Sequence, residues 1–411
     1  MKFLPVLPSL ALIASVITTA AAPGDWPTWR GPKRDGLSTE TGLLKQWPAG
    51  GPPLAWKTKG CGTGYSAVSV ADGRVITMGD GPDGARVLAF DLSGKPLWQS
   101  EAIGKPGGNY PGTRCTPAID EGLVYALGQF GDFACLDAKS GKAIWTKSLQ
   151  KDFGGSYAGW NYTESPLVDA NKVLLTPGGN NGAMVALDKK TGALLWQSKQ
   201  WTDGAAYSSI VPSDFGGRRH YVQLTEDSVA GIDAANGNLL WRAPRKGAVA
   251  VIPTPILSGD LVFVTSGYGI GCNLFKLSRA GAVIATQQVY ANKSMADHHG
   301  GVILVGQHIY GHSDSGGWTC MDLRNGNVAW KNGGVGKGAV AYADGHFYCR
   351  SEGGNGTVAL VAATPTGYQE KGRFDQPDRS GKNSWAHPVI AGGKLYLRDM
   401  DVLLCYDVKQ K

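Results

Sequence analysis

The sequence predicts an all-β chain, an eight-bladed β-propeller of four-stranded antiparallel blades, and three observations support this prediction. A phrase of an aspartate, a glycine and a tryptophan recurs along the chain at nearly constant spacing. A second, independent turn recurs eight times at intervals of 38 to 49 residues. One strand is left over near the N-terminus, and one strand is missing at the C-terminus. Four strands per repeat at this period are typical of propellers.

The Asp-Gly-Trp phrase predicts the hairpin between the last two strands of a blade. Aspartate bonds its own backbone to start the turn, glycine supplies a positive φ, and tryptophan offers a broad surface to the neighbouring blade. The clear copies are marked by Asp91 and Trp98, Asp137 and Trp145, Asp188 and Trp196, Asp233 and Trp241, and Asp322 and Trp330. Two worn copies are expected, from Leu277 to Gly281 ending near Ala285, and from Ala363 to Gly367 ending near Phe374.

The second turn separates two apolar runs and predicts an earlier hairpin in every blade. It falls at residues 72–73, 121–122, 170–171, 216–217, 259–260, 306–307, 344–345 and 392–393. The last unit ends at Asp407 without an outer strand, whereas residues 54–57, with Trp56, form an outer strand without a blade. We expect these two parts to pair, because pairing closes the ring and removes both open edges.

Composition and charge argue against several classes of protein. The 411 residues include 60 Gly and 22 Pro and only 18% charged residues, which indicates many tight turns. The net charge of +7 is spread along the chain, whereas nucleic-acid binding calls for a basic patch. We therefore expect no nucleic-acid partner, and we expect a monomer. No stretch after the N-terminus is long and apolar enough to cross a membrane.

Residues 1–22 have the pattern of a secretory signal peptide: a positive start at Lys2, an apolar run over residues 10–17, and small residues at 18–22. An anchor helix is the alternative, but the run is short and Pro5 and Pro8 interrupt it. We therefore expect an exported protein, periplasmic or extracellular. Residues 23–53 are predicted to form an irregular arm lying on the propeller, which itself covers residues 54–411.

The seven cysteines are predicted to be structural. Their number is odd, so they cannot all pair within the chain, and no Cys-x-x-Cys is present. Cys135, Cys320 and Cys405 each precede a repeat aspartate by two residues. A position that recurs with the repeat is a packing position, where free cysteine behaves as a small apolar residue.

The repeat phrase resembles that of pyrroloquinoline quinone (PQQ) dehydrogenases and of the propeller lipoprotein of the outer-membrane β-barrel assembly machinery. The chain is most similar to exported PQQ-like propeller proteins of Planctomycetes and Verrucomicrobia. The resemblance covers essentially all of residues 54–411. The stretches that carry it are residues 26–32 (WPTWRGP), 298–301 (HHGG), 382–388 (KNSWAHP), 396–399 (YLRD) and 403–407 (LLCYD).

The resemblance implies PQQ with Ca²⁺ as the cofactor to consider. In the quinone enzymes two adjacent cysteines lie against the quinone, and Glu, Asn and Asp side chains hold the Ca²⁺. This sequence has no Cys-Cys, and the stretch comparable to the one with the calcium-ligating Glu, residues 178–182, is Gly-Gly-Asn-Asn-Gly. These departures disfavour PQQ with Ca²⁺, and no cofactor is assigned.

The segments that enter the innermost strands are expected to surround the mouth of the central channel. These segments are unusually polar and aromatic, and they come from blades distant in sequence. Such convergence of acids, bases and aromatic rings predicts a ligand site in the funnel. The candidates are Arg114, Trp160, Asn161, Glu164, Tyr207, Asp297, His298, His299, Lys337, Trp385 and His387.

Each candidate has a structural alternative. Arg114 and Glu164 are expected either to form an ion pair or to contact a ligand. His298 and His299 are adjacent, so on a strand at most one of them faces the channel. Imidazoles at 298, 299 and 387 with Asp297 are suitable ligands for zinc or iron, but their spacing matches no known type of site and no metal is assigned. Trp160 and Trp385 either stack on a sugar or quinone ring or plug the funnel.

These features favour a non-catalytic exported binding or scaffold protein for a protein, glycan or small molecule. The sequence leaves open whether the protein is an enzyme. The alternative is a funnel-site enzyme, of which a quinoprotein alcohol or sugar dehydrogenase, an oxidoreductase, is the first candidate.

Overall fold

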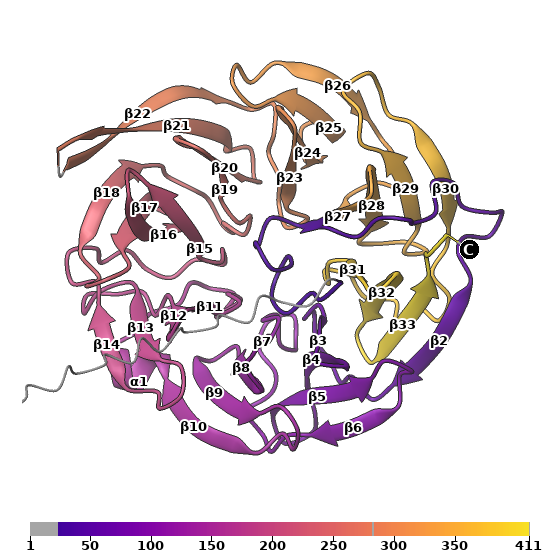
Figure 1. The fold of residues 1–411 in the computed structure, drawn as a ribbon, viewed down its shortest axis with the longest axis horizontal. Helices are drawn as coiled ribbons and strands as arrows, with labels where there is room; N and C mark the ends of the chain where they lie inside the picture. The colour runs from indigo at the N-terminus through magenta and orange to yellow at the C-terminus, as the bar shows by residue number, and fades with distance from the viewer. Residues whose placement is uncertain (1–23, 282, 411) are drawn as a thin grey trace, which may run out of the picture.

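The computed structural model describes residues 24–281 and 283–410, which form a ring of eight twisted sheets around a central axis (Figure 1). This confirms the predicted eight-bladed propeller. The predicted signal peptide lies outside the described residues. One short helix, α1 (Leu149–Phe153), follows the second blade. Within the described part of the chain, no helix has the length and apolar character needed to cross a membrane.

The strands of each blade run outward from the axis in chain order. The first four blades are β3 (Ser69–Ala71), β4 (Arg74–Asp80), β5 (Ala85–Asp91) and β6 (Pro96–Gln99); β7 (Ala118–Asp120), β8 (Leu123–Leu127), β9 (Asp132–Asp137) and β10 (Ala143–Ser148); β11 (Leu167–Asp169), β12 (Lys172–Leu175), β13 (Val185–Asp188) and β14 (Leu194–Gln197); and β15 (Val211–Phe215), β16 (Arg218–Leu224), β17 (Ser228–Asp233) and β18 (Leu239–Pro244). The next three are β19 (Ile256–Ser258), β20 (Leu261–Ser266), β21 (Gly271–Ala280) and β22 (Val283–Asn292); β23 (Val302–Val305), β24 (His308–Ser313), β25 (Gly317–Asp322) and β26 (Val328–Asn332); and β27 (Gly338–Ala343), β28 (His346–Ser351), β29 (Val358–Ala362) and β30 (Glu370–Phe374).

The eighth blade closes the ring. Its inner strands are β31 (Val389–Ala391), β32 (Lys394–Asp399) and β33 (Val402–Asp407), and its outer strand is β2 (Leu54–Lys59) from the N-terminal side. The pairing of β2 with β33 is antiparallel and places Trp56 opposite Cys405. The predicted closure is therefore confirmed.

The predicted inner hairpins occur in all eight blades, at the predicted residues. In the first blade Asp72 and Gly73 have φ values of 52° and 69°. Two consecutive residues with positive φ form the turn whose twist matches that of the flanking strands. Glycine, aspartate and asparagine tolerate this conformation best, which is why these turns could be found in the sequence.

The repeat phrase builds the outer hairpin and also joins neighbouring blades. Asp137 Oδ1 accepts hydrogen bonds from the backbone N–H groups of Lys139 and Ser140 and so fixes the turn. The indole of Trp98 lies against Gly141 of the next blade and donates to the carbonyl of Ala138 at 3.0 Å. Tryptophans 56, 145, 196 and 330 donate in the same way to residues of the next blade, Leu92, Lys189, Ala234 and Thr364.

The predicted position of the first worn copy of the repeat phrase, residues 277–285, was wrong. The hairpin of β21 and β22 extends well past residues 277–285, and it projects beyond the ring in Figure 1. Tyr290 occupies the position of the repeat tryptophan: it pairs with Leu274 next to a bulge, and its hydroxyl donates to the carbonyl of Leu323 in the next blade at 2.8 Å. A longer hairpin shifted the aromatic residue out of the expected spacing.

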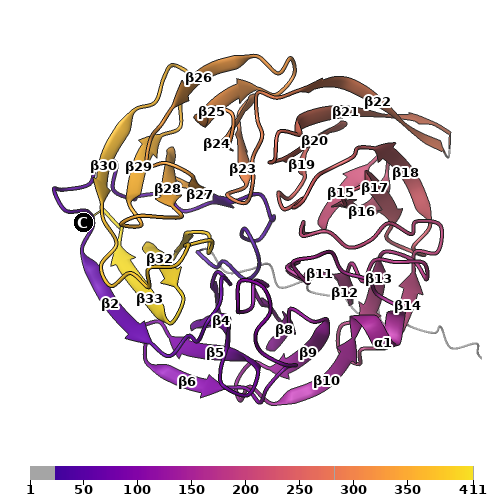
Figure 2. The ribbon, with the colours of Figure 1, turned by 180° about the vertical axis from the view of Figure 1, so that it is seen from behind.

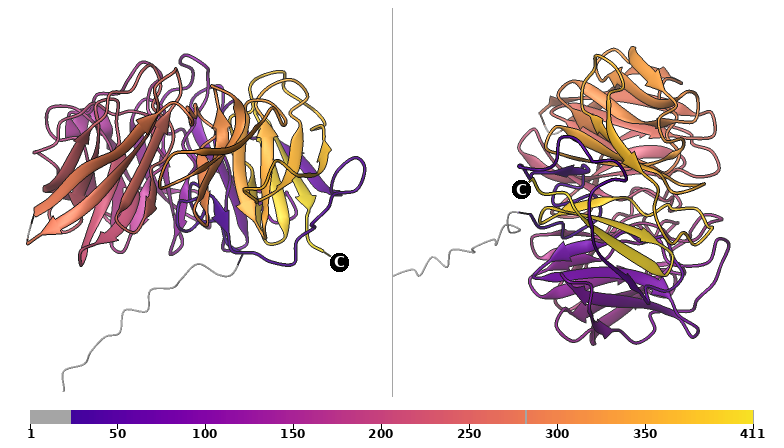
Figure 3. Two further views of the ribbon diagram at one scale, coloured as in Figure 1. Left: turned by 90° about the horizontal axis from the view of Figure 1, so that it is seen from above. Right: turned by 90° about the vertical axis from the view of Figure 1, so that its right-hand side faces the viewer.

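The N-terminal arm does more than lie on the ring, because it enters the centre of one face (Figures 2 and 3). Its short strand β1 (Leu37–Ser38) pairs in parallel with β27. Arg34 is buried and donates to the carbonyl of Ser165, which precedes β11, at 2.7 Å. Arg30 is also buried and donates to the carbonyl of Val302 in β23 at 2.5 Å. The arm thus ties blades on opposite sides of the axis together.

The seven cysteines are all free and buried. Burial raises the pKa of Cys115 to about 12, so its thiol stays protonated and weakly reactive.

Candidate functional site

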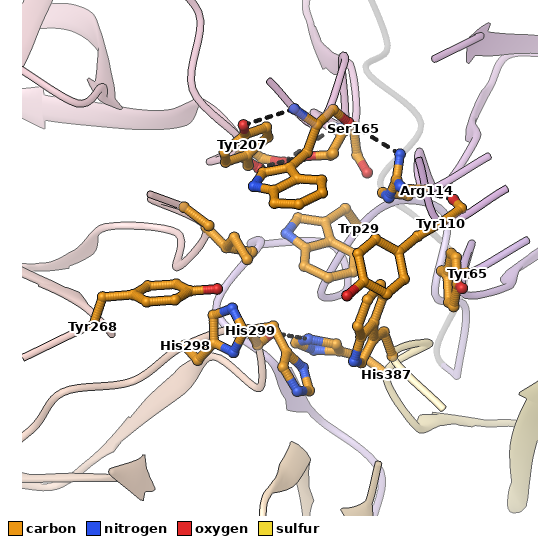
Figure 4. Close-up of a pocket in the computed structure, with 16 residues that line it drawn as sticks. Trp29, Tyr65, Tyr110, Arg114, Ser165, Tyr207, Tyr268, His298, His299 and His387 are labelled. Atoms are coloured by element: carbon orange, nitrogen blue, oxygen red, sulfur yellow. Dashed lines mark hydrogen bonds between the residues drawn. The ribbon is translucent and has the colours of Figure 1, made fainter. Parts of the chain in front are cut away.

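A cavity of about 170 Å³ lies at the centre of the ring and opens to solvent (Figure 4). We call this cavity and its lining the cup. Most of its walls come from the segments that precede the innermost strands, as expected from the sequence. The lining residues are Trp29, Tyr65, Tyr110, Arg114, Trp160, Thr163, Ser165, Tyr207, Ser209, Ala250, Ile252, Tyr268, His298, His299, Trp385 and His387.

The cup has a nearly continuous belt of aromatic rings. On one side Trp160 contacts Tyr110, with ring centroids 5.5 Å apart, and Tyr110 contacts Trp385 at 5.1 Å. From Trp385 the belt continues through the two adjacent imidazoles to Tyr268, with successive centroid distances of 6.0, 5.3 and 4.9 Å. Tyr65 packs on Trp385 at 4.5 Å. Aromatic faces therefore line most of the circumference.

The N-terminal arm contributes to the lining through Trp29. Its indole Nε1 donates to Thr254 Oγ1 at 3.0 Å, and its ring lies 4.5 Å from that of His387. His387 in turn is hydrogen-bonded through Nε2 to the carbonyl of His299 at 2.9 Å. Burial lowers the pKa of His387 to about 3, so its imidazole is neutral at pH 7.

Arg114 lies on the wall opposite His298 in Figure 4. Its Nη2 donates to the carbonyls of Asn109 and Tyr110 at 2.7 and 2.8 Å, and its Nη1 donates to that of Trp160 at 3.1 Å. Its guanidinium carbon lies 5.7 Å from the centroid of the Tyr65 ring, a cation–π contact. These contacts hold the side chain in a defined position at the cup.

The histidine wall is supported from behind by Glu352. Its Oε2 lies 2.7 Å from His299 Nε2 and accepts from Trp385 Nε1 at 2.8 Å. Burial is the main cause that lowers the pKa of His298 to about 4, so its imidazole is neutral at pH 7. The Nδ1 atoms of His298 and His299 are buried and have no hydrogen-bond partner among the described residues.

Strained backbone gathers at the cup. Tyr110, Asn161, Val249 and Tyr268 have φ values of 53°, 66°, 56° and 56°, although none is a glycine. Each such residue costs about 1–3 kcal/mol, and such outliers cluster at functional sites. Two of them line the cup and the other two are adjacent to lining residues.

Seven of the predicted candidates line the cup: Arg114, Trp160, Tyr207, His298, His299, Trp385 and His387. Four do not: Asn161, Glu164, Asp297 and Lys337. Glu164 is bound to Thr176 and Gln223, Asp297 accepts from the backbone of Gly301, and Lys337 pairs with Asp314 at 3.1 Å.

Two sequence-based interpretations were wrong. Arg114 and Glu164 do not form an ion pair, because Arg114 donates to main-chain carbonyls and Glu164 is bound to Thr176 and Gln223. His298 and His299 both line the cup, because they lie in a loop before β23 and the alternation of a strand does not apply.

The buried carboxyl of Glu164 is expected to make the stability of the protein depend on pH. Burial raises this pKa from 4.5 to about 7, against the opposing effects of Thr176 and Arg34. A carboxyl whose folded pKa is raised contributes stability that is complete below the unfolded pKa and is lost as the pH rises through the folded value. Asp297, whose pKa burial also raises to about 7, has the same sign.

We therefore expect the melting temperature of the wild type to fall by several degrees relative to that of Glu164→Gln between about pH 5 and pH 8. The glutamine has the shape of the protonated acid and no charge to desolvate. Differential scanning fluorimetry across this range measures the difference, with the exposed Glu101→Gln as the control. A constant difference between wild type and Glu164→Gln would show that Glu164 does not titrate in this window.

Nine of the sixteen lining residues were not among the candidates, and four of these nine are aromatic: Trp29, Tyr65, Tyr110 and Tyr268. Trp29 belongs to the N-terminal arm, and the path of this arm across the axis is set by tertiary contacts. Tyr110 and Tyr268 lie in Gly-rich loops, at residues 107–112 and 267–271. The sequence signal that could have indicated these two tyrosines as site residues was an aromatic residue inside a Gly-rich loop.

The cup does not offer the ligands that a calcium-held quinone requires. No carboxylate lines it, and residues 178–182 are not part of its lining. Among the residues that the structure describes, no group of three or more His, Cys, Asp or Glu side chains is placed to hold a metal ion.

The family model described as outer membrane protein assembly factor BamB matches residues 83–332 of this chain. The BamB protein of Moranella endobia is 28% identical over 218 residues, 50% of this chain and 49% of that protein. The chain thus spans about half the length of the curated relatives that it matches.

Two solved structures share the fold. The crystal structure of BamB from Moraxella catarrhalis has a TM-score of 0.61 at 15% identity, covering 87% of this chain and 98% of that one. Quinohemoprotein alcohol dehydrogenase from Comamonas testosteroni has a TM-score of 0.64 at 14% identity, covering 95% of this chain and 82% of that one. At these identities the likeness concerns the fold alone.

Proposed function

The chain belongs to the PQQ-like propeller family described as outer membrane protein assembly factor BamB, and we propose that it is an exported binding protein that holds a ring-shaped small molecule or sugar residue in its cup. Its exported location rests on the signal-peptide pattern of residues 1–22. The proposal needs no cofactor. The described side chains do not supply the group of ligands that a quinone held by a metal ion would require.

The observation that carries the proposal is the aromatic belt. Rings of Trp160, Tyr110, Trp385 and Tyr268 surround a cavity of about 170 Å³ that opens to solvent. Aromatic faces bind the C–H faces of sugar rings and other flat apolar groups, and their burial in a ligand complex is favourable.

The exposure of two belt residues supports the same conclusion. Tyr110 and Tyr268 are 49% and 47% exposed, although each is held in a strained backbone conformation. A side chain that stays half in water contributes little to packing, so the strain is better explained by a role in binding.

Removing these two rings tests the proposal. We expect Tyr110→Ala and Tyr268→Ala each to raise the Kd for a bound disaccharide about tenfold, while the melting temperature changes by less than about 2 °C. Quenching of tryptophan fluorescence, which Trp29, Trp160 and Trp385 in the lining make sensitive, measures the affinity. Ile144→Ala is the control, because Ile144 is 50% exposed on β10 at the outer rim.

The proposal fails if neither neutral nor acidic disaccharides bind, or if Tyr110→Ala and Tyr268→Ala bind them as tightly as Ile144→Ala does. A second candidate, protein binding at the outer rim, is favoured by exposed aliphatic side chains on β6, β10 and β14, namely Leu97, Ile144 and Leu194, which are 46%, 50% and 52% exposed. In that case Ile144→Ala weakens binding of a partner protein and the tyrosine variants do not.

A further inference from the structure

We propose that the ligand of the cup is an acidic sugar, such as a uronic acid residue, and that Arg114 binds its carboxylate. This inference rests on the proposed function and specifies the chemical class of its ligand. It starts from the charge of the cup. Arg114 is the only Lys, Arg, Asp or Glu among the sixteen lining residues.

The charge of Arg114 is not neutralised by an ion pair among the described residues. All three of its hydrogen bonds go to main-chain carbonyls. Asp80 acts on it only at longer range, since its Oδ2 is bound to the backbone of Gly107 and to Gln129. A half-buried cation without a counter-ion is a binding site for an anion in a wall of low polarity.

The guanidinium also has donors to spare. It carries five N–H groups, and the three hydrogen bonds to main-chain carbonyls use three of them. The other two remain for a ligand. Hydrogen bonds from arginine to a carboxylate are about twice as strong as those between neutral groups.

The remaining walls of the cup hold no lysine, second arginine or carboxylate. His298 and His387 are neutral at pH 7, with pKa values lowered by burial to about 4 and about 3. The Glu352 carboxylate lies outside the lining, behind His299 and Trp385, and Lys337 acts on it electrostatically. Among the lysine, arginine and carboxylate side chains of the chain, the cup therefore offers Arg114 alone, beside aromatic rings and imidazoles.

The ring geometry favours a sugar over a flat aromatic acid. Neighbouring rings of the belt are tilted by 34° to 80°, so they form no parallel slot that would sandwich a planar molecule. The lining also holds tyrosine, serine and threonine side chains, whose hydroxyls can bond to a ligand, beside the indole rings. This combination suits a sugar ring, which presents C–H patches and hydroxyl groups side by side.

A matched pair of ligands tests the inference on the wild-type protein. We expect a galacturonic acid disaccharide to bind at least tenfold more tightly than the neutral galactose disaccharide of the same linkage, with the difference shrinking as salt is added. Equal affinity for the two would overturn the inference and leave the proposed function intact. Binding of neither would overturn the proposed function, and the inference with it. PQQ is included as a ligand with a flat anionic ring. If PQQ bound and the acidic disaccharide did not, this result would also overturn the inference.

Variants of Arg114 locate the charge. We expect Arg114→Gln to weaken binding of the acidic disaccharide at least tenfold and to change that of the neutral one by less than about twofold. Arg114→Lys keeps the charge, and we expect it to retain part of the preference. Arg373→Gln, which removes a positive charge at the outer rim, is the control. An equal loss for both disaccharides in a folded Arg114→Gln protein would contradict the inference, because the side chain would then act on the sugar rather than on its charge.

Discussion

Replacing residues 54–59 by six Gly and Ser residues is expected to lower the thermal midpoint of unfolding by more than about 10 °C. These residues form β2, the outer strand of the eighth blade, and they pair with β33 along its length. Trp56 also lies against Gly94 and donates to the carbonyl of Leu92 at 2.9 Å, which joins the eighth blade to the first. Losing this strand opens the ring, because no other segment of residues 24–281 and 283–410 pairs with the outer edge of β33.

The replacement keeps the chain length between the arm and the first blade, so the result measures pairing and packing. Circular dichroism on heating gives the midpoint. Deletion of residues 409–411 at the C-terminus is the comparison, and we expect it to have a much smaller effect. Its contacts are few: an isolated bridge between Leu43 and Lys409, and a hydrogen bond from Gln410 to Gly42. Equal losses in the two variants would contradict closure by β2.

The second large effect is expected at Arg398, in β32. This side chain is 2% exposed, and its guanidinium donates to six oxygen atoms. The acceptors are Cys61 O, Gly62 O, Ser66 O, Thr77 Oγ1, Met78 O and Met400 O. All but the last belong to the first blade or to the segment that leads into it. One arginine therefore supports the seam between the last blade and the first.

We expect Arg398→Met to destabilise the protein by about 3–5 kcal/mol, because it leaves buried carbonyl groups without donors. Arg398→Lys has fewer donors and cannot reach acceptors on several sides, so we expect it to recover only part of the stability. Urea titration followed by tryptophan fluorescence measures both. Arg373→Ala is the control, since this half-exposed arginine and Glu370 form a surface ion pair worth less than about 1 kcal/mol. A loss at Arg398 no larger than that at Arg373 would show that the seam does not depend on this side chain.

The fold could be predicted because its rules are local. Turns such as Asp72-Gly73 require residues that accept a positive φ, and this requirement is visible in two letters of sequence. The Asp-Gly-Trp phrase likewise fixes a hairpin within nine residues. Where the local rule was broken, as in the long hairpin that carries Tyr290, the position of the aromatic residue was missed, although the blade itself was counted correctly.

The candidate site could be predicted only in part. The segments entering the inner strands were the right place to look, and Arg114, Trp160 and Trp385 were found there. Which side chain of such a segment faces the cavity depends on loop conformation. Glu164 and Ser165 are neighbours, yet Ser165 lines the cup while Glu164 is buried against Thr176 and Gln223.

The sequence by itself determined the number of blades, the hairpins within them and the strand that closes the ring, since each follows from short-range turn chemistry and a fixed repeat. Only the tertiary structure decided that the arm brings Trp29 to the axis, that both adjacent imidazoles line one cavity, and that Arg114 donates its hydrogen bonds to main-chain carbonyls. These properties depend on which segments from opposite sides of the ring come into contact at its centre. Such contacts join residues far apart in the chain, so the spacing of neighbouring residues does not predict them.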